Sequence, residues 1–109
     1  MQISANFDSG NIDVIKADHP EQIELHIRKD HQSDFFQWFH FKLHNIHHVK
    51  HVIKITNAGA AAYVDGWPDY QAVASYDRQF WFRVPTEFDG QHLTITVTPE
   101  HDALYFAYF

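Results

Sequence analysis

Histidine is the most concentrated chemically active residue type in this sequence, and four histidines lie in one short stretch. Residues 43–51 read LHNIHHVKH. Imidazole nitrogens are common zinc ligands, but a zinc site needs three or four ligands, usually oriented by nearby hydrogen-bond acceptors. The nearest carboxylates in sequence, Asp34 and Asp65, lie outside the stretch, and neither HxxE nor HExxH occurs in the chain. The pattern favours a solvated polar turn over a physiological metal site. A metal buffer stays open as an alternative, with these ligands: His44, His47, His48 and His51.

The other sequence signatures of enzymes are missing from the chain. It contains no GxGxxG, GxxxxGK[ST] or GxSxG motif, and it has no cysteine to serve as a nucleophile. The carboxylate pairs Asp8 with Asp13 and Glu87 with Asp89 lie beside glycine-containing turns, where acidic residues are ordinarily solvated. We therefore expect no catalytic residue, no metal ligand and no cofactor in this chain itself.

A mixture of large aromatic rings and arginines distinguishes residues 65–90, DGWPDYQAVASYDRQFWFRVPTEFDG. A guanidinium group can bind a carboxylate through two hydrogen bonds or stack on an aromatic ring. One interpretation is structural, with Asp77 paired to an arginine at the corner of a strand. The other is functional, because Trp, Tyr and Arg are enriched at protein interfaces. The candidate interface or binding residues are Trp67, Tyr70, Tyr76, Arg78, Trp81 and Arg83.

Length and composition limit the class of protein. The 109 residues are 45% hydrophobic and 17% aromatic, which predicts one domain, 1–109, with its own core and a preference for strands. The net charge of −6 offers no basic field for nucleic acid. The absence of cysteine excludes disulfides and agrees with a reducing compartment. No apolar run is long enough to span a membrane, and the first residues lack the pattern of a signal peptide, so we expect a cytoplasmic protein.

Period-two alternation of apolar and polar residues recurs along the chain, as is typical of half-buried strands. It covers residues 22–27, 35–43, 49–55 and 93–97, with turn signals at Gly10-Asn11, Asp65-Gly66 and Asp89-Gly90. Short strands separated by turns predict an all-β fold, an antiparallel β-sandwich. Residues 35–43 and 49–55 flank the histidine stretch, so we expect a hairpin with its histidines exposed at the tip. In that hairpin, His40 and His51 would face each other.

Four segments of the sequence resemble, in order, the N-terminal domain of zinc carboxypeptidases of the cytosolic carboxypeptidase type. They are ISANFDSGNI (3–12), FFQWFHFKL (35–43), residues 65–90 quoted above, and the terminal YFAYF (105–109). The resemblance spans nearly the whole chain and implies an antiparallel β-sandwich that packs against an α/β catalytic domain. In that family the zinc ligands, the general-base glutamate and the arginines that bind the substrate carboxylate belong to the second domain, and no position here matches them.

The resemblance also implies what the parent protein does. We expect this chain to be the front piece of a longer enzyme in which zinc and a glutamate-activated water release C-terminal amino acids from peptides or proteins. Its partner would be its own catalytic domain, and the domain would stabilise the enzyme and shape substrate access. Without that partner, an exposed apolar patch could cause self-association.

An independent β-sandwich that binds a carbohydrate or a peptide is the alternative function. In this interpretation Trp67, Tyr70 and Trp81 form an aromatic platform for the ligand. Such a module should keep a saturable ligand when isolated, whereas an interface domain should recognise its own catalytic half.

Overall fold

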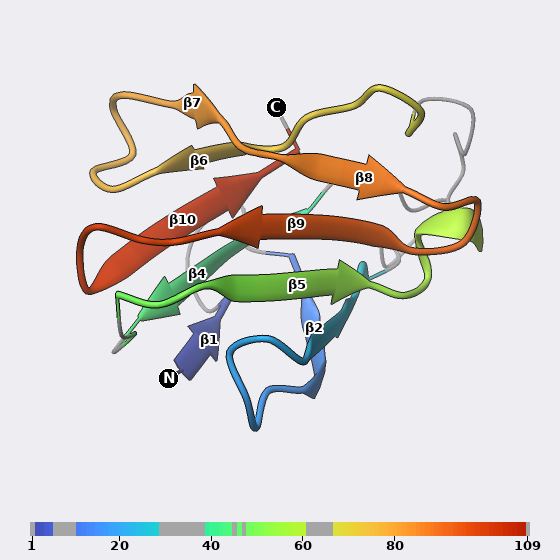
Figure 1. The fold of residues 1–109 in the computed structure, drawn as a ribbon, viewed down its shortest axis with the longest axis horizontal. Coiled ribbons are helices and arrows are strands. Elements are labelled where there is room, and N and C mark those ends of the chain that lie inside the picture. The colour runs from blue at the N-terminus through green and yellow to red at the C-terminus, as the bar shows by residue number, and fades with distance from the viewer. Residues whose placement is uncertain are drawn as a thin grey trace.

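The computed structural model describes residues 2–5, 11–28, 39–44, 46, 48–60 and 67–108. Within these residues the chain forms ten short strands and one 3-10 helix (Figure 1). The elements are β1 (Gln2–Ser4), β2 (Asp13–Lys16), β3 (Ile23–His26), β4 (His40–His44), β5 (His51–Ile55), η1 (Ala58–Ala60), β6 (Val73–Ser75), β7 (Phe82–Arg83), β8 (Thr86–Phe88), β9 (Leu93–Val97) and β10 (Ala103–Ala107).

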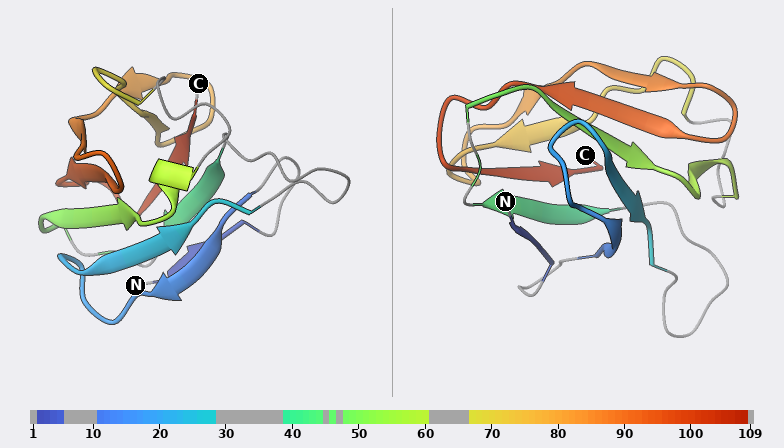
Figure 2. Two further views of the ribbon diagram at one scale, coloured as in Figure 1. Left: turned by 90° about the vertical axis from the view of Figure 1, so that its right-hand side faces the viewer. Right: turned by 60° about the horizontal axis from the view of Figure 1, so that its bottom comes forward.

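The strands form two five-stranded sheets that face each other. Sheet A has the order β1-β4-β10-β6-β7, and sheet B has the order β2-β3-β5-β9-β8. Figure 1 shows β5 and β9 of sheet B crossing in front of β4 and β10 of sheet A, and the second view in Figure 2 shows the two layers. Neighbouring strands are antiparallel except β3 and β5, which are parallel. The predicted all-β sandwich is therefore confirmed, with one parallel pair in a sheet that is otherwise antiparallel.

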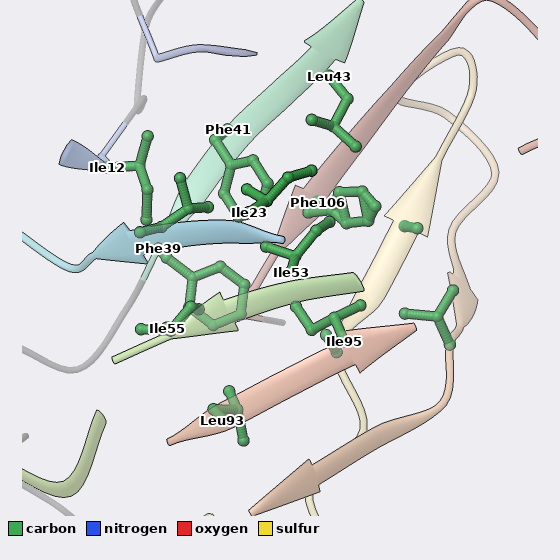
Figure 3. Packing of buried hydrophobic residues seen from close by; sticks show 14 of the residues in the cluster. Ile12, Ile23, Phe39, Phe41, Leu43, Ile53, Ile55, Leu93, Ile95 and Phe106 are labelled. Atoms are coloured by element: carbon green, nitrogen blue, oxygen red, sulfur yellow. The ribbon is translucent and has the colours of Figure 1, made fainter. Parts of the chain in front are cut away.

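The core lies between the inward faces of the two sheets (Figure 3). The alternation in the sequence predicted these faces correctly for 22–27, 39–43 and 93–95, because the apolar residues of those segments are buried. Full burial of one large apolar side chain contributes roughly 1.5–3 kcal/mol, so these residues supply the main stabilisation of the fold. The fully buried large side chains are Trp67, Phe39, Phe41, Phe106, Ile23, Leu25, Leu43, Ile53, Ile55, Leu93, Ile95 and Leu104.

The predicted hairpin between residues 35–43 and 49–55 is wrong. β4 belongs to sheet A and β5 to sheet B, so the segment between them crosses from one sheet to the other. His40 and His51 therefore do not face each other across a ladder. His51 is fully buried at the start of β5, whereas the apolar Val49, the first residue of the alternating segment 49–55, is 48% exposed. His51 is consequently a core residue, and its Nδ1–H donates to the carbonyl oxygen of Val49 at 2.7 Å.

The predicted turn at Asp89-Gly90 is confirmed as the connection between β8 and β9. Gly90 has a φ of +102°, a backbone conformation that favours glycine. One carboxylate oxygen of Asp89 accepts hydrogen bonds from the backbone N–H groups of Gln91 and His92, at 2.9 and 2.6 Å. These hydrogen bonds lower the pKa of Asp89. The turn expected at Asp65-Gly66 and the Gly10 half of the Gly10-Asn11 turn lie outside the described residues.

Candidate functional site

The six candidate residues divide into three groups. Trp67 and Tyr70 take part in an aromatic cluster that packs on the core. Arg83 lies on the outward face of sheet A, because it is paired with Val73 in the register of β6 and β7 and is exposed. Tyr76, Arg78 and Trp81 belong to the segment that joins those two strands. The structure therefore does not bring all six residues together in one site.

Trp67 is part of the core, with 1% of its surface exposed. Its indole N–H donates to the carbonyl oxygen of Ala58 at 2.9 Å. Its ring system makes T-shaped contacts with the rings of Tyr70 and Tyr108, with centroid distances of 5.3 and 5.5 Å. A buried Trp cannot present its face to a ligand. The platform proposed from Trp67, Tyr70 and Trp81 is therefore not formed.

Tyr70 holds the chain at the end of β10. Its hydroxyl donates a hydrogen bond to the carbonyl oxygen of Tyr108, and the two rings are stacked with centroids 5.2 Å apart. Burial raises the pKa of the Tyr70 hydroxyl well above its ordinary value, and the nearby Tyr108 raises it further. The N–H of Tyr108 donates to the carbonyl oxygen of Phe39 at 3.0 Å. We call Trp67, Tyr70 and Tyr108 the exit cluster, because they surround the point where the chain leaves sheet A.

The segment between β6 and β7 is a tight loop organised by the side chains of Ser75 and Asp77. The Ser75 hydroxyl oxygen accepts hydrogen bonds from the N–H groups of Asp77 and Arg78, at 3.3 and 2.8 Å. The Asp77 carboxylate accepts hydrogen bonds from the N–H groups of Gln79 and Phe80, at 2.8 and 2.9 Å, and from Ser75. These bonds lower the pKa of Asp77. Asp77 therefore stabilises its own loop rather than pairing with an arginine.

The loop between β6 and β7 carries three large side chains, Tyr76, Arg78 and Phe80. Arg78 has a φ of +64°, and its guanidinium lies 5.3 Å from the ring centroid of Tyr105 on β10. Phe80 is 71% exposed. Tyr76 packs against His101 at a centroid distance of 4.6 Å, and its hydroxyl accepts a hydrogen bond from the N–H of Glu100. The loop is thus attached to β10 through Arg78 and, through Tyr76, to residues 100–101 in the turn that precedes β10.

Trp81 extends across the outward face of sheet A. Its ring lies 6.1 Å from the ring of His40 on β4, although β10 and β6 separate β4 from β7. Neighbouring strands are about 4.8 Å apart, so the Trp81 side chain has to pass over the strands between them. Val73, Ser75 and Ala107 on this face are each less than a tenth exposed. Small residues therefore occupy the middle of the face.

Lysine and arginine side chains surround the aromatic residues of this face. The Lys42 ammonium lies 5.3 Å from the centroid of Tyr105, the same distance as the Arg78 guanidinium. Arg83 donates a 2.7 Å hydrogen bond to the carbonyl oxygen of Gln71. We define the sheet A outer face by the following six residues: His40, Lys42, Arg78, Trp81, Arg83 and Tyr105.

Sequence reasoning did not include three of these six residues among the candidates. In the alternating segment 35–43, His40 and Lys42 occupy the positions between the apolar residues Phe39, Phe41 and Leu43, which predicts that they point away from the core, and the structure confirms this. What the alternation could not show is that β10 lies beside β4 and brings Tyr105 opposite Lys42. The pairing of strands distant in the sequence assembled this face.

The histidine stretch does not form a metal site in the described part of the chain. No group of three or more His, Cys, Asp or Glu residues there is arranged to hold a metal ion, and His47 lies outside the described residues. His48 instead lies 3.3 Å from the carboxylate of Asp102. Likewise, no helix among the described residues is both long and apolar enough to cross a membrane.

Comparisons with known proteins match the whole chain to one part of longer proteins. The family model described as the cytosolic carboxypeptidase N-terminal domain matches residues 3–109. An uncharacterised protein of Zymomonas mobilis is 49% identical over 109 residues, which are all of this chain and 28% of that protein.

Solved structures of bacterial metallo-carboxypeptidases agree with that match. The Burkholderia cenocepacia metallo-carboxypeptidase is 50% identical with a TM-score of 0.97, over 99% of this chain and 28% of that one. The Pseudomonas aeruginosa metallo-carboxypeptidase, solved with (2-guanidinoethylmercapto)succinic acid, is 50% identical with a TM-score of 0.98, and the match covers 100% of this chain and 29% of that one. The chain thus spans less than a third of the length of these relatives. It belongs to the family of cytosolic carboxypeptidase N-terminal domains.

Proposed function

We propose that this chain is a non-catalytic domain that packs against the catalytic domain of a metallo-carboxypeptidase, stabilises it and shapes the access of substrate. The observation that carries the proposal is the coverage, because the match is complete on this chain and extends over only 28–29% of the relatives. The remaining length of those relatives supplies the room for a catalytic domain. We propose a cytoplasmic location, in keeping with the description of the family.

The parent enzyme, in this proposal, hydrolyses C-terminal amino acids from peptides or proteins. A zinc ion would polarise the scissile carbonyl and activate water when it is bound in the catalytic domain. The described residues of this chain do not fit that role, since they contain no cluster of three potential metal ligands. The chain contributes packing and position rather than chemistry.

In this proposal the catalytic domain is attached at the end of β10. β10 is the middle strand of sheet A, with β4 on one side and β6 on the other, and the C-terminus lies at its end (Figure 1). The exit cluster fixes Tyr108 at that point. A domain that continues from a rigid central strand starts from a defined position and direction, which favours packing over free tumbling.

The coding sequence after Phe109 provides the first test. The proposal expects it to continue in frame into a domain that contains HxxE and a later histidine, the ligand order of zinc carboxypeptidases. The complete protein should then release C-terminal amino acids from a peptide and lose this activity with a chelator. Deletion of residues 1–109 should lower the thermal stability of the remainder. A stop codon after Phe109, or a remainder that is equally stable and active without residues 1–109, would overturn the proposal.

The isolated domain offers a second test, because removal of a partner exposes the surface that the partner covers. Among the large apolar side chains that are exposed here, Phe80 lies in the loop between β6 and β7 that also carries Arg78, whereas Val14 and Ile15 lie on β2 at the edge of sheet B. We expect the isolated chain to self-associate weakly, with a sedimentation coefficient that rises with protein concentration. A strictly monomeric chain at high concentration would count against an exposed interface.

A further inference from the structure

We propose that the sheet A outer face is the surface that docks on the catalytic domain, and that it meets an acidic surface with apolar side chains at its centre. This inference rests on the proposed function and names the contact that it requires. The contact is not the solvated face of sheet B. Four observations identify it: charge, preorganisation, the contrast with the opposite sheet, and the position of the chain end.

The charge of the face is opposite to that of the whole chain. Lys42, Arg78 and Arg83 are three of the eight basic residues, and they gather here although the net charge of the chain is −6. Among the described strand positions that point outward from sheet A, none is Asp or Glu. These positions, read from the register of its ladders, are Gln2, Ser4, His40, Lys42, His44, Val73, Ser75, Arg83, Ala103, Tyr105 and Ala107. A cationic surface of this kind fits an acidic partner.

The side chains of the face are held in place before any partner binds. The Arg83 guanidinium donates to the carbonyl oxygen of Gln71, and the Arg78 guanidinium lies 5.3 Å from the ring centroid of Tyr105 while the Ser75 hydroxyl holds the Arg78 backbone N–H. Their guanidinium groups therefore lose less conformational freedom on binding than mobile arginines would. The rings of Trp81 and Tyr105 lie among these cations and supply the apolar centre. Buried aromatic anchors surrounded by charged groups are typical of protein interfaces.

The opposite face of the sandwich differs in its charge pattern. On sheet B, Glu24 lies opposite both Lys16 and Lys54 in the ladders, and Glu87 lies opposite Thr94. Charges of both signs that alternate across strands stabilise each other and suit a solvated surface. At the described strand positions of sheet A no acidic residue lies opposite Lys42 or Arg83, and the exposed carboxylate of Asp77, next to Arg78 in the loop, accepts hydrogen bonds from backbone N–H groups of that loop. The two faces of one small domain thus differ as a docked face differs from a solvent-exposed face.

The end of the chain makes the catalytic domain the expected occupant. β10 carries Tyr105 on the sheet A outer face and ends at Ala107, and more than two thirds of the length of the relatives lies outside the matched part. A segment that follows β10 spans at most about 3.5 Å per residue, so a short connection already reaches the outward side of the same sheet. Because the partner is in the same polypeptide, its effective concentration at this face is high.

The test uses the complete polypeptide and compares two charge-reversed variants. K42E/R83E reverses the sheet A outer face, and K16E/K54E makes the same change in net charge on sheet B. We expect K42E/R83E to separate the domains, seen as a larger radius of gyration in X-ray scattering and a melting temperature close to that of the protein lacking residues 1–109. The control K16E/K54E places two glutamates opposite Glu24, so it should lower the melting temperature of the isolated chain and of the complete polypeptide to a similar extent, but it should leave the radius of gyration of the complete polypeptide unchanged. The same two variants of the 109-residue chain show whether each domain still folds.

A measurement without any variant keeps the proposal testable if K42E/R83E does not fold. In lysine acetylation of the complete polypeptide, Lys42 should react at least about tenfold more slowly than in the isolated chain, because an interface covers it. Lys16 and Lys54 should react equally fast in both. Equal reactivity of Lys42 in both forms would overturn the inference.

The outcomes separate this inference from the proposed function. If deletion of residues 1–109 destabilises the remainder but K42E/R83E does not, the domain packs through another face and only the inference fails. If deletion has no effect, the proposed function fails as well. If K42E/R83E abolishes self-association of the isolated chain and leaves the complete polypeptide unchanged, the face binds a second copy, and the catalytic domain is excluded as its occupant.

Discussion

Removal of the Tyr70 hydroxyl is the most direct way to test whether the exit cluster holds the end of β10. In Tyr70→Phe the ring remains, so its stacking on Tyr108 at 5.2 Å and its contact with Trp67 at 5.3 Å are kept. Only the hydrogen bond to the carbonyl oxygen of Tyr108 is lost. The substitution therefore isolates one polar contact within an apolar cluster.

The expected loss of stability follows from the burial of this contact. An intramolecular hydrogen bond contributes about 1 kcal/mol to the free energy of unfolding, and a buried group that loses its partner adds to that loss, so we expect about 1–2 kcal/mol. For a domain near 100 residues, each kcal/mol lowers the melting temperature by about 4–8 °C. Tyr76→Phe is the matched control. Its hydroxyl accepts from the exposed N–H of Glu100, which water can replace, so we expect about 0.5 kcal/mol or less.

Thermal and urea unfolding of the 109-residue chain, followed by circular dichroism, measure both variants. Agreement of the two methods is needed, since the comparison assumes two-state unfolding. If Tyr70→Phe and Tyr76→Phe lower the melting temperature by the same small amount, the Tyr70 hydroxyl does not secure the end of β10. The end of β10 would then not be a fixed point from which the chain leaves sheet A.

Three further predictions concern ionisation and packing. Burial raises the pKa of the Tyr70 hydroxyl, so the unfolded chain loses the hydroxyl proton at a lower pH than the folded chain does. The free energy of unfolding should therefore fall as the pH rises through about 10. Tyr70→Phe should weaken this loss at alkaline pH, and an unchanged dependence of stability on pH in this variant would contradict the prediction. Hydrogen bonds lower the pKa of Asp77 in the folded chain, so its contribution to the free energy of unfolding is complete above about pH 3.9 and is lost as the pH falls through the lower folded pKa. In Asp77→Asn the urea concentration at the midpoint of unfolding should therefore fall less steeply at acid pH. An equally steep fall in this variant would show that Asp77 is not the cause. In Gly59→Ala the added Cβ would lie 2.8 Å from the Cα of Gln91, so we expect a loss of about 1–3 kcal/mol in urea unfolding, and unchanged stability would show that the backbone adjusts freely.

The strands and their buried faces were predictable because they depend on local alternation. Ile23, Leu25 and Ile27 are buried as their spacing indicated, and so are Phe39 and Phe41. Period-two patterning fixes the face of each residue as soon as one face of the strand is covered. The resemblance to the carboxypeptidase family indicated the same architecture from different evidence. The family match confirms the resemblance, and the order of the strands confirms the architecture.

The pairing of the strands was less predictable, because alternation does not specify which strand lies alongside. The segment containing β4 and the segment containing β5 are close in sequence and strongly patterned, which favours a hairpin. In the structure, β4 pairs with β1 and β10, and β5 pairs with β3 and β9. A connection that crosses between sheets is common in sandwiches, and no residue in the connection distinguishes it from a hairpin. The burial of His51 follows from that crossing and was missed with it.

The candidate site shows the same limit. Residues 67–83 are rich in aromatic and basic side chains, but their division between core and surface depends on which side of sheet A each one occupies. Trp67 is buried by Tyr70 and Tyr108, the second of which comes from the other end of the sequence. Lys42 and Tyr105 join Arg78 only because β10 lies between β4 and β6. Composition drew attention to this region, whereas the grouping of Lys42, Arg78 and Tyr105 on one surface follows only from the fold.

β10 connects the core, the proposed docking face and the point where the chain leaves the domain. Phe106 packs on Phe41 in the core with a centroid distance of 5.1 Å, Tyr105 lies beside Lys42 and Arg78 on the sheet A outer face, and Tyr108 is held by Tyr70. As the middle strand, β10 cannot shift without breaking its ladders with both neighbours. Under the proposed docking, the catalytic domain is attached to this one strand at its end and along its outward side. Two contacts on the same rigid element fix orientation as well as proximity, so a substitution that loosens β10 should weaken the fold of this domain and the placement of its partner together.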